Sequence, residues 1–339
     1  FWLSLRVEER LQHPIVQEFI KSYEEKFGDP YSYVCNALPA ILAKIKTIEE
    51  LKVVKEIITS YQEKFGDPFK YVRDALPAIL AKIKTIEELK VVKELITSFQ
   101  EKLGDPFRYV GDALPGILAH IKTIEELKVV KELITSYQEK FGHPYRYVRD
   151  ALPVLLAKIK TIEELKEWND IVLELITSYQ EKFGDPSRYV GYDLPAILAH
   201  IKTIEELKVI KDLITSYQEK FGDPYFYVRD VLPVLLAHIK TIEELKVVKE
   251  LIIRYQNDTG NPNDYIQSVL TELIPLLRNL QILKASHYEI FLAVRDIVRQ
   301  QESSGWNKFK DALNVLVLLI RFGDFTNSLA YLKGQVEQV

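Results

Sequence analysis

Apolar residues recur with helical spacing along most of the chain, and they do so in paired segments. In the segment that starts at Thr47 they fall three or four positions apart, at Leu51, Val54, Ile58, Tyr61 and Phe65. After Gly66 a second stripe follows at Val72, Ala75, Leu76, Ile79, Leu80 and Ile83. This spacing places the apolar side chains on one face of a helix. We therefore predict two amphipathic helices in each segment.

Polar and special residues mark the ends of both helices. Thr47 with Glu50 forms a capping box, in which each side chain accepts a backbone N–H at the helix start. Gly66 is typical of a left-handed cap at a helix end. Asp67 is expected to cap the second helix, with Pro68 at its first position. Because only two residues separate the second helix from the next segment, neighbouring helices must be antiparallel.

The helix pair is repeated along the chain. The string Thr-Ile-Glu-Glu-Leu-Lys begins at Thr47, Thr85, Thr123, Thr161, Thr203 and Thr241, in steps of 38, 38, 38, 42 and 38 residues. Repeats of this length stack on their neighbours and bury a continuous core. We predict an all-α solenoid, a superhelix of about seven helix pairs: a capping helix over residues 1–12, seven repeats over 13–283, and a helical cap over 284–339.

The longer step contains four extra residues, 167–170, which amount to about one helical turn. The insertion can lengthen a helix while its buried face stays in register. Trp168 lies in this insertion and has two interpretations. It fills the core, or it anchors a partner at the interruption.

The start of the second helix resembles the HEAT-repeat motif. The segment Asp67-Pro68-Phe69-Lys70-Tyr71-Val72-Arg73-Asp74-Ala75-Leu76 matches that family's Asp-Pro, Val-Arg and helically spaced Ala and Leu, and the match recurs over most of residues 13–283. A tetratricopeptide array fits the period less well. The resemblance implies a solenoid that binds proteins, or less often nucleic acid. It also implies a ladder between repeats through Asp67 and Arg73, which Cys35, Gly111 and Gly191 would interrupt.

A proline recurs inside the second helix, at Pro39, Pro77, Pro115, Pro153, Pro195, Pro233 and Pro275. An interior proline removes a backbone hydrogen bond and kinks an α-helix. We expect the row to curve the array. A row of freed carbonyls that face a ligand is the alternative.

Composition limits where the protein works. The 339 residues carry a net charge of −4, which does not suit a strongly basic nucleic-acid protein. A single cysteine, Cys35, rules out an internal disulfide and favours a reducing compartment, so we predict a cytoplasmic protein. The longest strongly apolar run, Val315–Ile320, is too short to cross a membrane.

No pattern in the sequence predicts catalysis, a cofactor or a metal. His120, His200 and His238 share one register, and packed helices lie about 8–10 Å apart. His120 and His200 are two repeats apart, too far to share a metal ion, and His200 with His238 would form at best a pair without a third ligand. The carboxylates repeat in identical settings, whereas a catalytic pair needs two different ones. Cys35 has no evident base. We expect no small-molecule ligand.

The positions that differ between repeats lie at the start and outer face of the second helix, while core and cap positions barely change. Exposed, repeat-specific positions suit a modular binding surface, although drift on a solvated face gives the same pattern. The candidate partner-binding residues are Lys70, Arg73, Arg108, Arg146, Arg149, Arg188, Arg229, His120, His200 and His238. We predict a non-catalytic scaffold for a protein or peptide on this face, expected to be concave. The alternatives are a nucleic-acid binder and an engineered, consensus-like array without a natural ligand.

Overall fold

A computed structural model describes residues 2–258, 260–271 and 274, and over these residues the fold is an all-α solenoid without a β-strand. The helix pairs follow the predicted period of about 38 residues. The chain divides into two compact units, which meet in the sequence between Leu198 and Ala199. The predicted cap at 284–339, the last proline of the row and the apolar run at 315–320 lie outside the described residues.

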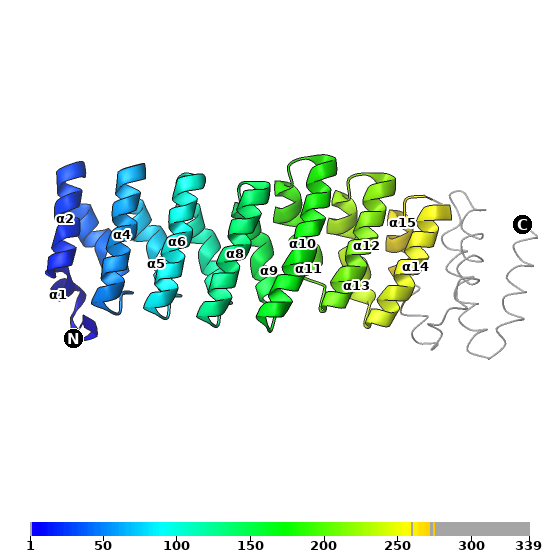
Figure 1. Cartoon of the computed structure of the whole chain (residues 1–339), viewed down its shortest axis with the longest axis horizontal. Helices are drawn as coiled ribbons and strands as arrows, with labels where there is room; N and C mark the ends of the chain where they lie inside the picture. The colour runs from blue at the N-terminus through cyan, green and yellow to red at the C-terminus, as the bar shows by residue number, and fades with distance from the viewer. Residues whose placement is uncertain (1, 259, 272–273, 275–339) are drawn as a thin grey trace, which may run out of the picture. The chain divides into compact units, whose positions relative to one another are not determined.

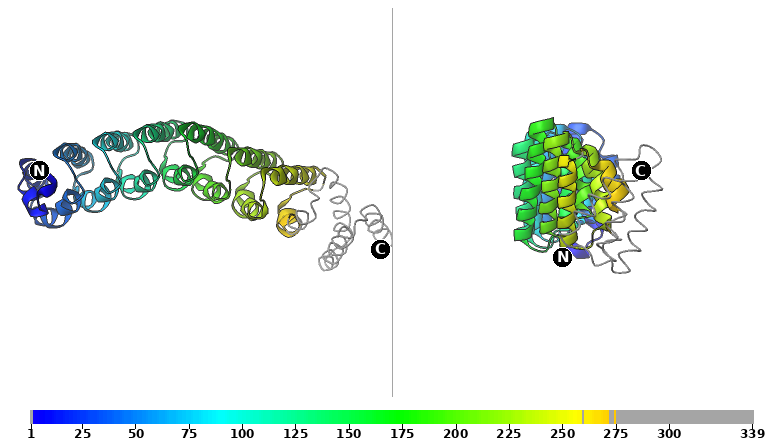
Figure 2. Two further views of the ribbon diagram at one scale, coloured as in Figure 1. Left: turned by 90° about the horizontal axis from the view of Figure 1, so that it is seen from below. Right: turned by 90° about the vertical axis from the view of Figure 1, so that its right-hand side faces the viewer.

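In the first compact unit, the long first helices of the repeats stand side by side in one layer (Figure 1). They are α2 (Pro14–Phe27), α4 (Ile48–Phe65), α6 (Ile86–Lys102), α8 (Ile124–Phe141) and α10 (Ile162–Phe183). The second helices form the other layer (Figure 2). Their α-helical parts are α3 (Leu38–Leu42), α5 (Leu76–Leu80), α7 (Leu114–Leu118), α9 (Leu152–Leu156) and α11 (Leu194–Leu198).

The second compact unit continues the same plan. Here α12 (Ile204–Phe221) packs against α14 (Ile242–Asp258). The second helices are formed by η7 (Tyr227–Val231) with α13 (Leu232–His238), and by α15 (Asn263–Tyr265) with η8 (Ile266–Leu270). The repeat pattern therefore extends through the described part of repeat 7, which starts at Thr241.

The predicted second helix is not one kinked α-helix. A five-residue π-helix comes before the proline in the first five repeats, as η2 (Tyr33–Ala37), η3 (Tyr71–Ala75), η4 (Tyr109–Ala113), η5 (Tyr147–Ala151) and η6 (Tyr189–Asp193). In η3 the N–H of Leu76 bonds to the carbonyl of Tyr71, five residues back. In an α-helix, Pro77 would clash with the carbonyl four residues earlier and leave it without a donor. In the wider π-helical turn, backbone N–H groups bond to carbonyls five residues back instead of four. The expected curvature stays a prediction.

The helix caps agree with the sequence in kind and differ in detail. Thr47 Oγ1 accepts the N–H of Glu50 at 3.0 Å, while the Glu50 carboxylate accepts the N–H of Lys46 at 2.6 Å, one residue before the expected donor. Gly66 has φ +86° and ψ −134°. Its φ is positive as predicted, but its ψ lies outside the left-handed helical region, so the predicted left-handed cap is wrong. This conformation is nearly restricted to glycine.

Stacked aromatic rings join the two helices of each repeat. Tyr61 of α4 lies flat on Tyr71 of η3, with ring centres 4.1 Å apart and an interplanar angle of 8°. The same stack occurs at Tyr23–Tyr33, Phe99–Tyr109, Tyr137–Tyr147, Tyr179–Tyr189, Tyr217–Tyr227 and Tyr255–Tyr265. The tyrosine of the second helix is buried in every repeat, so these rings are part of the core.

The N-terminal residues close the first repeat. Instead of one helix over 1–12, they form a 3₁₀ turn, η1 (Trp2–Ser4), and a short helix, α1 (Val7–Leu11). The indole of Trp2 donates to the carbonyl of Ile45 at 3.1 Å, and Arg10 donates to the carbonyl of Leu42 at 2.7 Å. The bond from Arg10 satisfies a carbonyl group at the end of α3, where a helix leaves its last carbonyls without partners.

Candidate functional site

The second-helix layer carries a repeated cluster of three side chains. In repeat 2, which starts at Thr47, the guanidinium carbon of Arg73 lies 5.0 Å from the ring centre of Phe69. The same guanidinium donates to Asp74, from Nε to Oδ1 at 2.6 Å and from Nη2 to Oδ2 at 2.7 Å. We call this arrangement the aromatic–arginine–aspartate triad. Because one helical turn separates the ring from the arginine, the backbone itself places them together.

The triad occurs in every second repeat. Tyr145, Arg149 and Asp150 form it in repeat 4, and Tyr225, Arg229 and Asp230 form it in repeat 6. The intervening repeats carry Cys35, Gly111 and Gly191 at the arginine position. Comparing single positions between repeats missed the triad. An aromatic residue four positions before an Arg-Asp pair is the signal that finds it.

In each triad the negative charge of the aspartate offsets the positive charge of the arginine. The pKa of Asp74 is lowered, first by its hydrogen bond to Arg73, while partial burial opposes the shift. The pKa of Arg149 is raised, chiefly by its hydrogen bonds to Asp150 and Tyr145. Each of these arginines is therefore balanced by an adjacent carboxylate, which weakens its attraction for a phosphate.

Arg146 makes a different contact. Its guanidinium carbon lies 4.8 Å above the ring of Tyr192, and its Nη1 donates to the Tyr192 hydroxyl at 3.1 Å. A Cβ atom built on Gly191 would lie 2.8 Å from Cδ of Arg146. The absence of a side chain at Gly191 thus lets an arginine of the preceding repeat lie across repeat 5.

The predicted site residues lie on the second helices or directly after them, but they do not converge on one point. Lys70, Arg73, Arg108, Arg188 and His200 are exposed, whereas Arg146, Arg149, Arg229, His120 and His238 are half-buried. His238 Nδ1 lies 2.9 Å from the carbonyl of Val234. Among the described residues, no group of three or more His, Cys, Asp or Glu side chains could hold a metal. Within the first compact unit, the predicted residues follow one another along the second-helix layer.

The ladder expected between Asp67 and Arg73 does not form, because Arg73 pairs with Asp74. The aspartate of the Asp-Pro turn instead serves two other bonds. Asp105 Oδ1 accepts the N–H of Phe107 at 2.9 Å, and the Tyr61 hydroxyl of the preceding repeat donates to Asp105 Oδ2 at 3.3 Å. The second of these bonds joins repeat 2 to repeat 3.

One junction departs from this pattern in both partners. Phe99 stands at the position of Tyr61, and His143 at that of Asp105. Here the hydroxyl of Tyr109 lies 3.0 Å from Nδ1 of His143, and the Tyr109 ring is tilted by 25° from its stacking partner Phe99. Burial lowers the pKa of His143. The second-helix tyrosine thus supplies the hydroxyl that phenylalanine lacks.

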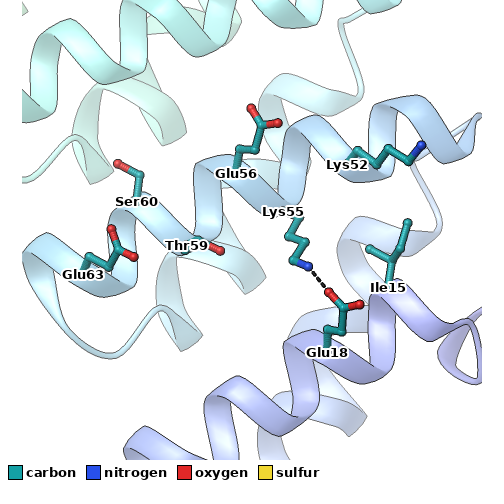
Figure 3. A pocket seen from close by; sticks show the side chains of 8 residues that line it. All are labelled: Ile15, Glu18, Lys52, Lys55, Glu56, Thr59, Ser60 and Glu63. Atoms are coloured by element: carbon teal, nitrogen blue, oxygen red, sulfur yellow. Dashed lines mark hydrogen bonds and ion pairs between the residues drawn. The ribbon is translucent and has the colours of Figure 1, made fainter.

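The surface of the first compact unit is hollowed between α2 and α4, and again between the turns of two repeats. A groove of about 650 Å³ between α2 and α4 is lined by Ile15, Glu18, Lys52, Lys55, Glu56, Thr59, Ser60 and Glu63. Figure 3 shows Lys55 and Glu18 pointing toward each other across it. Its lining carries both signs of charge, from glutamate and lysine side chains. A hollow of about 400 Å³ lies between the turns of repeats 2 and 3, lined by Tyr61, Asp67, Phe69, Lys70, Asp105 and Phe107.

Burial decides between the two interpretations of Trp168 in the insertion of repeat 5. Trp168 is 4% exposed and Asn169 1% exposed, so Trp168 fills the core and does not present a surface anchor.

In the described part of the chain, no helix is long and apolar enough to cross a membrane. Comparison with protein-family models, curated sequences and solved structures finds no match for this chain.

Proposed function

We propose that this chain is a non-catalytic repeat scaffold that binds a protein or peptide along its second-helix layer. The observation that carries the proposal is the triad, because it is a partly exposed polar cluster that varies between repeats whose core hardly changes. Fixed cores with variable surface side chains suit a modular binding surface. The proposal includes a place among HEAT-like solenoids and a cytoplasmic location.

The charges on this layer favour a polypeptide over nucleic acid. A nucleic-acid surface needs several cations that are free to replace counterions at phosphates. Arg73, Arg149 and Arg229 are each paired with the aspartate that follows them. Side chains of both signs beside aromatic rings can instead match a protein surface by charge and by contact area.

A peptide selection tests the proposal. The purified chain is presented to a random peptide library displayed on phage, and enriched peptides are measured by calorimetry. We expect their affinity to fall when Arg108 and Arg149 are both replaced by glutamate. The matched control replaces Lys90 and Lys128 by glutamate. Both control residues lie on exposed positions of the first-helix layer, so their replacement should leave the affinity unchanged.

Two outcomes would contradict the proposal. One is that first-helix variants weaken the peptides as much as second-helix variants do. The other is tight binding of a fluorescent oligonucleotide that is lost between about 50 and 200 mM salt, the behaviour of phosphate contacts. The second outcome would favour the nucleic-acid alternative.

A further inference from the structure

Repeat 3, which starts at Thr85, holds an incomplete triad. It has the aromatic ring, Phe107, and the carboxylate, Asp112, but Gly111 stands where repeats 2, 4 and 6 carry arginine. Phe107 is half-buried and Asp112 is exposed. Within the described part of the chain, Asp112 has no ion-pair partner, although Arg108 lies one turn before it. The two groups that hold the guanidinium in the other repeats, the ring and the carboxylate, are thus present without it.

The space beside Gly111 is open at the position that a Cβ atom would take. A Cβ atom built there would meet only Ala75, at 3.6 Å from its Cβ, which is an ordinary contact. Gly191 shows that a glycine at this position can admit an arginine from elsewhere, because Arg146 of the preceding repeat lies against it. Lys70 of repeat 2 occupies the position in its repeat that Arg146 occupies in repeat 4. No atom of Lys70 lies within 4 Å of a Cβ atom built on Gly111.

The surroundings of Phe107 add to the attraction for a cation. Its ring lines the hollow of about 400 Å³, together with the carboxylates of Asp67 and Asp105 and the single cation Lys70. Both aspartates contribute to the raised pKa of Tyr61, after the larger effect of burial, so their negative charge reaches into this region. A planar guanidinium can stack on an aromatic face and donate to a carboxylate at the same time.

We infer that the Phe107–Gly111–Asp112 site of repeat 3 receives the side chain of an arginine from a partner polypeptide, which completes the aromatic–arginine–aspartate triad in trans. This inference rests on the proposed function as a polypeptide-binding scaffold, and it names one contact that the partner makes. Phe107 supplies the surface on which the guanidinium stacks, and Asp112 accepts two N–H groups of that guanidinium. Gly111 has no side chain that would occupy the space. In repeat 1 the same positions carry Tyr31, Cys35 and Asn36, so no carboxylate is present there.

The test uses a five-residue peptide with one central arginine between glycines and serines, and a second peptide with citrulline in its place. Citrulline has nearly the same shape without the charge. Nuclear magnetic resonance follows the Gly111 amide of the whole chain during titration. We expect the arginine peptide to shift this resonance with an affinity about five- to tenfold higher than that of citrulline.

Two variants sharpen the test. Gly111→Arg supplies the missing arginine in cis, as repeats 2, 4 and 6 do, and should abolish peptide binding while the helix content is kept. Arg73→Gly empties the triad of repeat 2 and should create a second binding site beside Phe69. Asp112→Asn should weaken binding, whereas Asp185→Asn, which alters a turn of repeat 5, should not.

Equal binding of the two peptides, or unchanged binding to Gly111→Arg, would overturn the inference. If the arginine peptide fails to bind while peptides from the library still depend on Arg108 and Arg149, only this contact is wrong. If the binding of those library peptides is also unaffected by replacing Arg108 and Arg149, both this inference and the proposed function are wrong.

Discussion

The hydroxyl of Tyr147, in the second helix of repeat 4, donates a hydrogen bond to Oδ1 of Asn169 in α10 of repeat 5. Counted back from the glycine that ends each first helix, Asn169 occupies a position where repeats 2, 3, 4 and 6 have leucine, such as Leu89 and Leu127. The four-residue insertion extends α10 to 22 residues, against 18 in α8. The longer helix therefore carries a polar core residue that satisfies a buried tyrosine.

The Tyr147–Asn169 bond predicts that two matched tyrosines respond differently to the loss of a hydroxyl. Tyr147→Phe leaves the buried Asn169 without its donor, so we expect a loss of about 1–3 kcal/mol in the free energy of unfolding. The Tyr71 hydroxyl is buried without a hydrogen-bond partner. Tyr71→Phe should then leave stability unchanged or raise it by up to about 1 kcal/mol. Urea unfolding followed by circular dichroism measures both, and equal effects would contradict the role of Asn169.

Two glycines should respond in opposite ways to alanine. Gly66 has φ +86°, so Gly66→Ala forces a side chain into a conformation that costs about 1–3 kcal/mol. At Gly111 a Cβ would make only an ordinary contact with Ala75, so Gly111→Ala should stabilise the helix by roughly 0.5–1 kcal/mol. Thermal unfolding of both variants checks this prediction. A lower melting temperature for Gly111→Ala would show that repeats 2 and 3 pack more tightly than we infer.

His143 should make stability depend on pH. Burial lowers its folded pKa below the ordinary value of 6.5, so folding favours the neutral ring. Nδ1 of the neutral ring can accept a hydrogen bond from the Tyr109 hydroxyl. As pH falls, His143 is protonated in the unfolded chain at a higher pH than in the folded chain. Its contribution to stability is therefore complete above about pH 6.5 and is lost as pH falls through the lower folded pKa. His143→Asn should flatten the slope of unfolding free energy in this window, and His120→Asn should not.

Helix caps should matter more than the ion pairs between first helices. Thr85 Oγ1 accepts the N–H of Glu88 at 3.2 Å, and Thr85→Ala should cost about 0.5–2 kcal/mol. The exposed pair of Lys93 with Glu56 links α4 and α6. Lys93→Ala should cost less than about 1 kcal/mol, and less again at high salt. Urea titrations at two salt concentrations measure this difference, and a larger loss for Lys93→Ala would contradict it.

The helix pairs, their spacing and the positions of their ends were predictable from the sequence because they depend on local chemistry. The Thr47 hydroxyl, Gly66 and the stripe from Leu51 to Phe65 act within one helix or its ends, and repetition multiplied that signal. The partly exposed second-helix face was also predictable, since it is where side chains vary. Gly191, which varies but is buried, is the exception.

The arrangements that bear on function were beyond the sequence pattern because their partners come from packing. Arg73 could have paired with Asp67 or Asp74, and side-chain geometry on the π-helix selected Asp74. Arg146 reaches Tyr192, 46 residues later, because Gly191 leaves space between two packed repeats. Local spacing predicts which face a residue takes along its own helix. Which neighbour it meets depends on how closely the next repeat approaches, and that distance is set by the buried side chains between them.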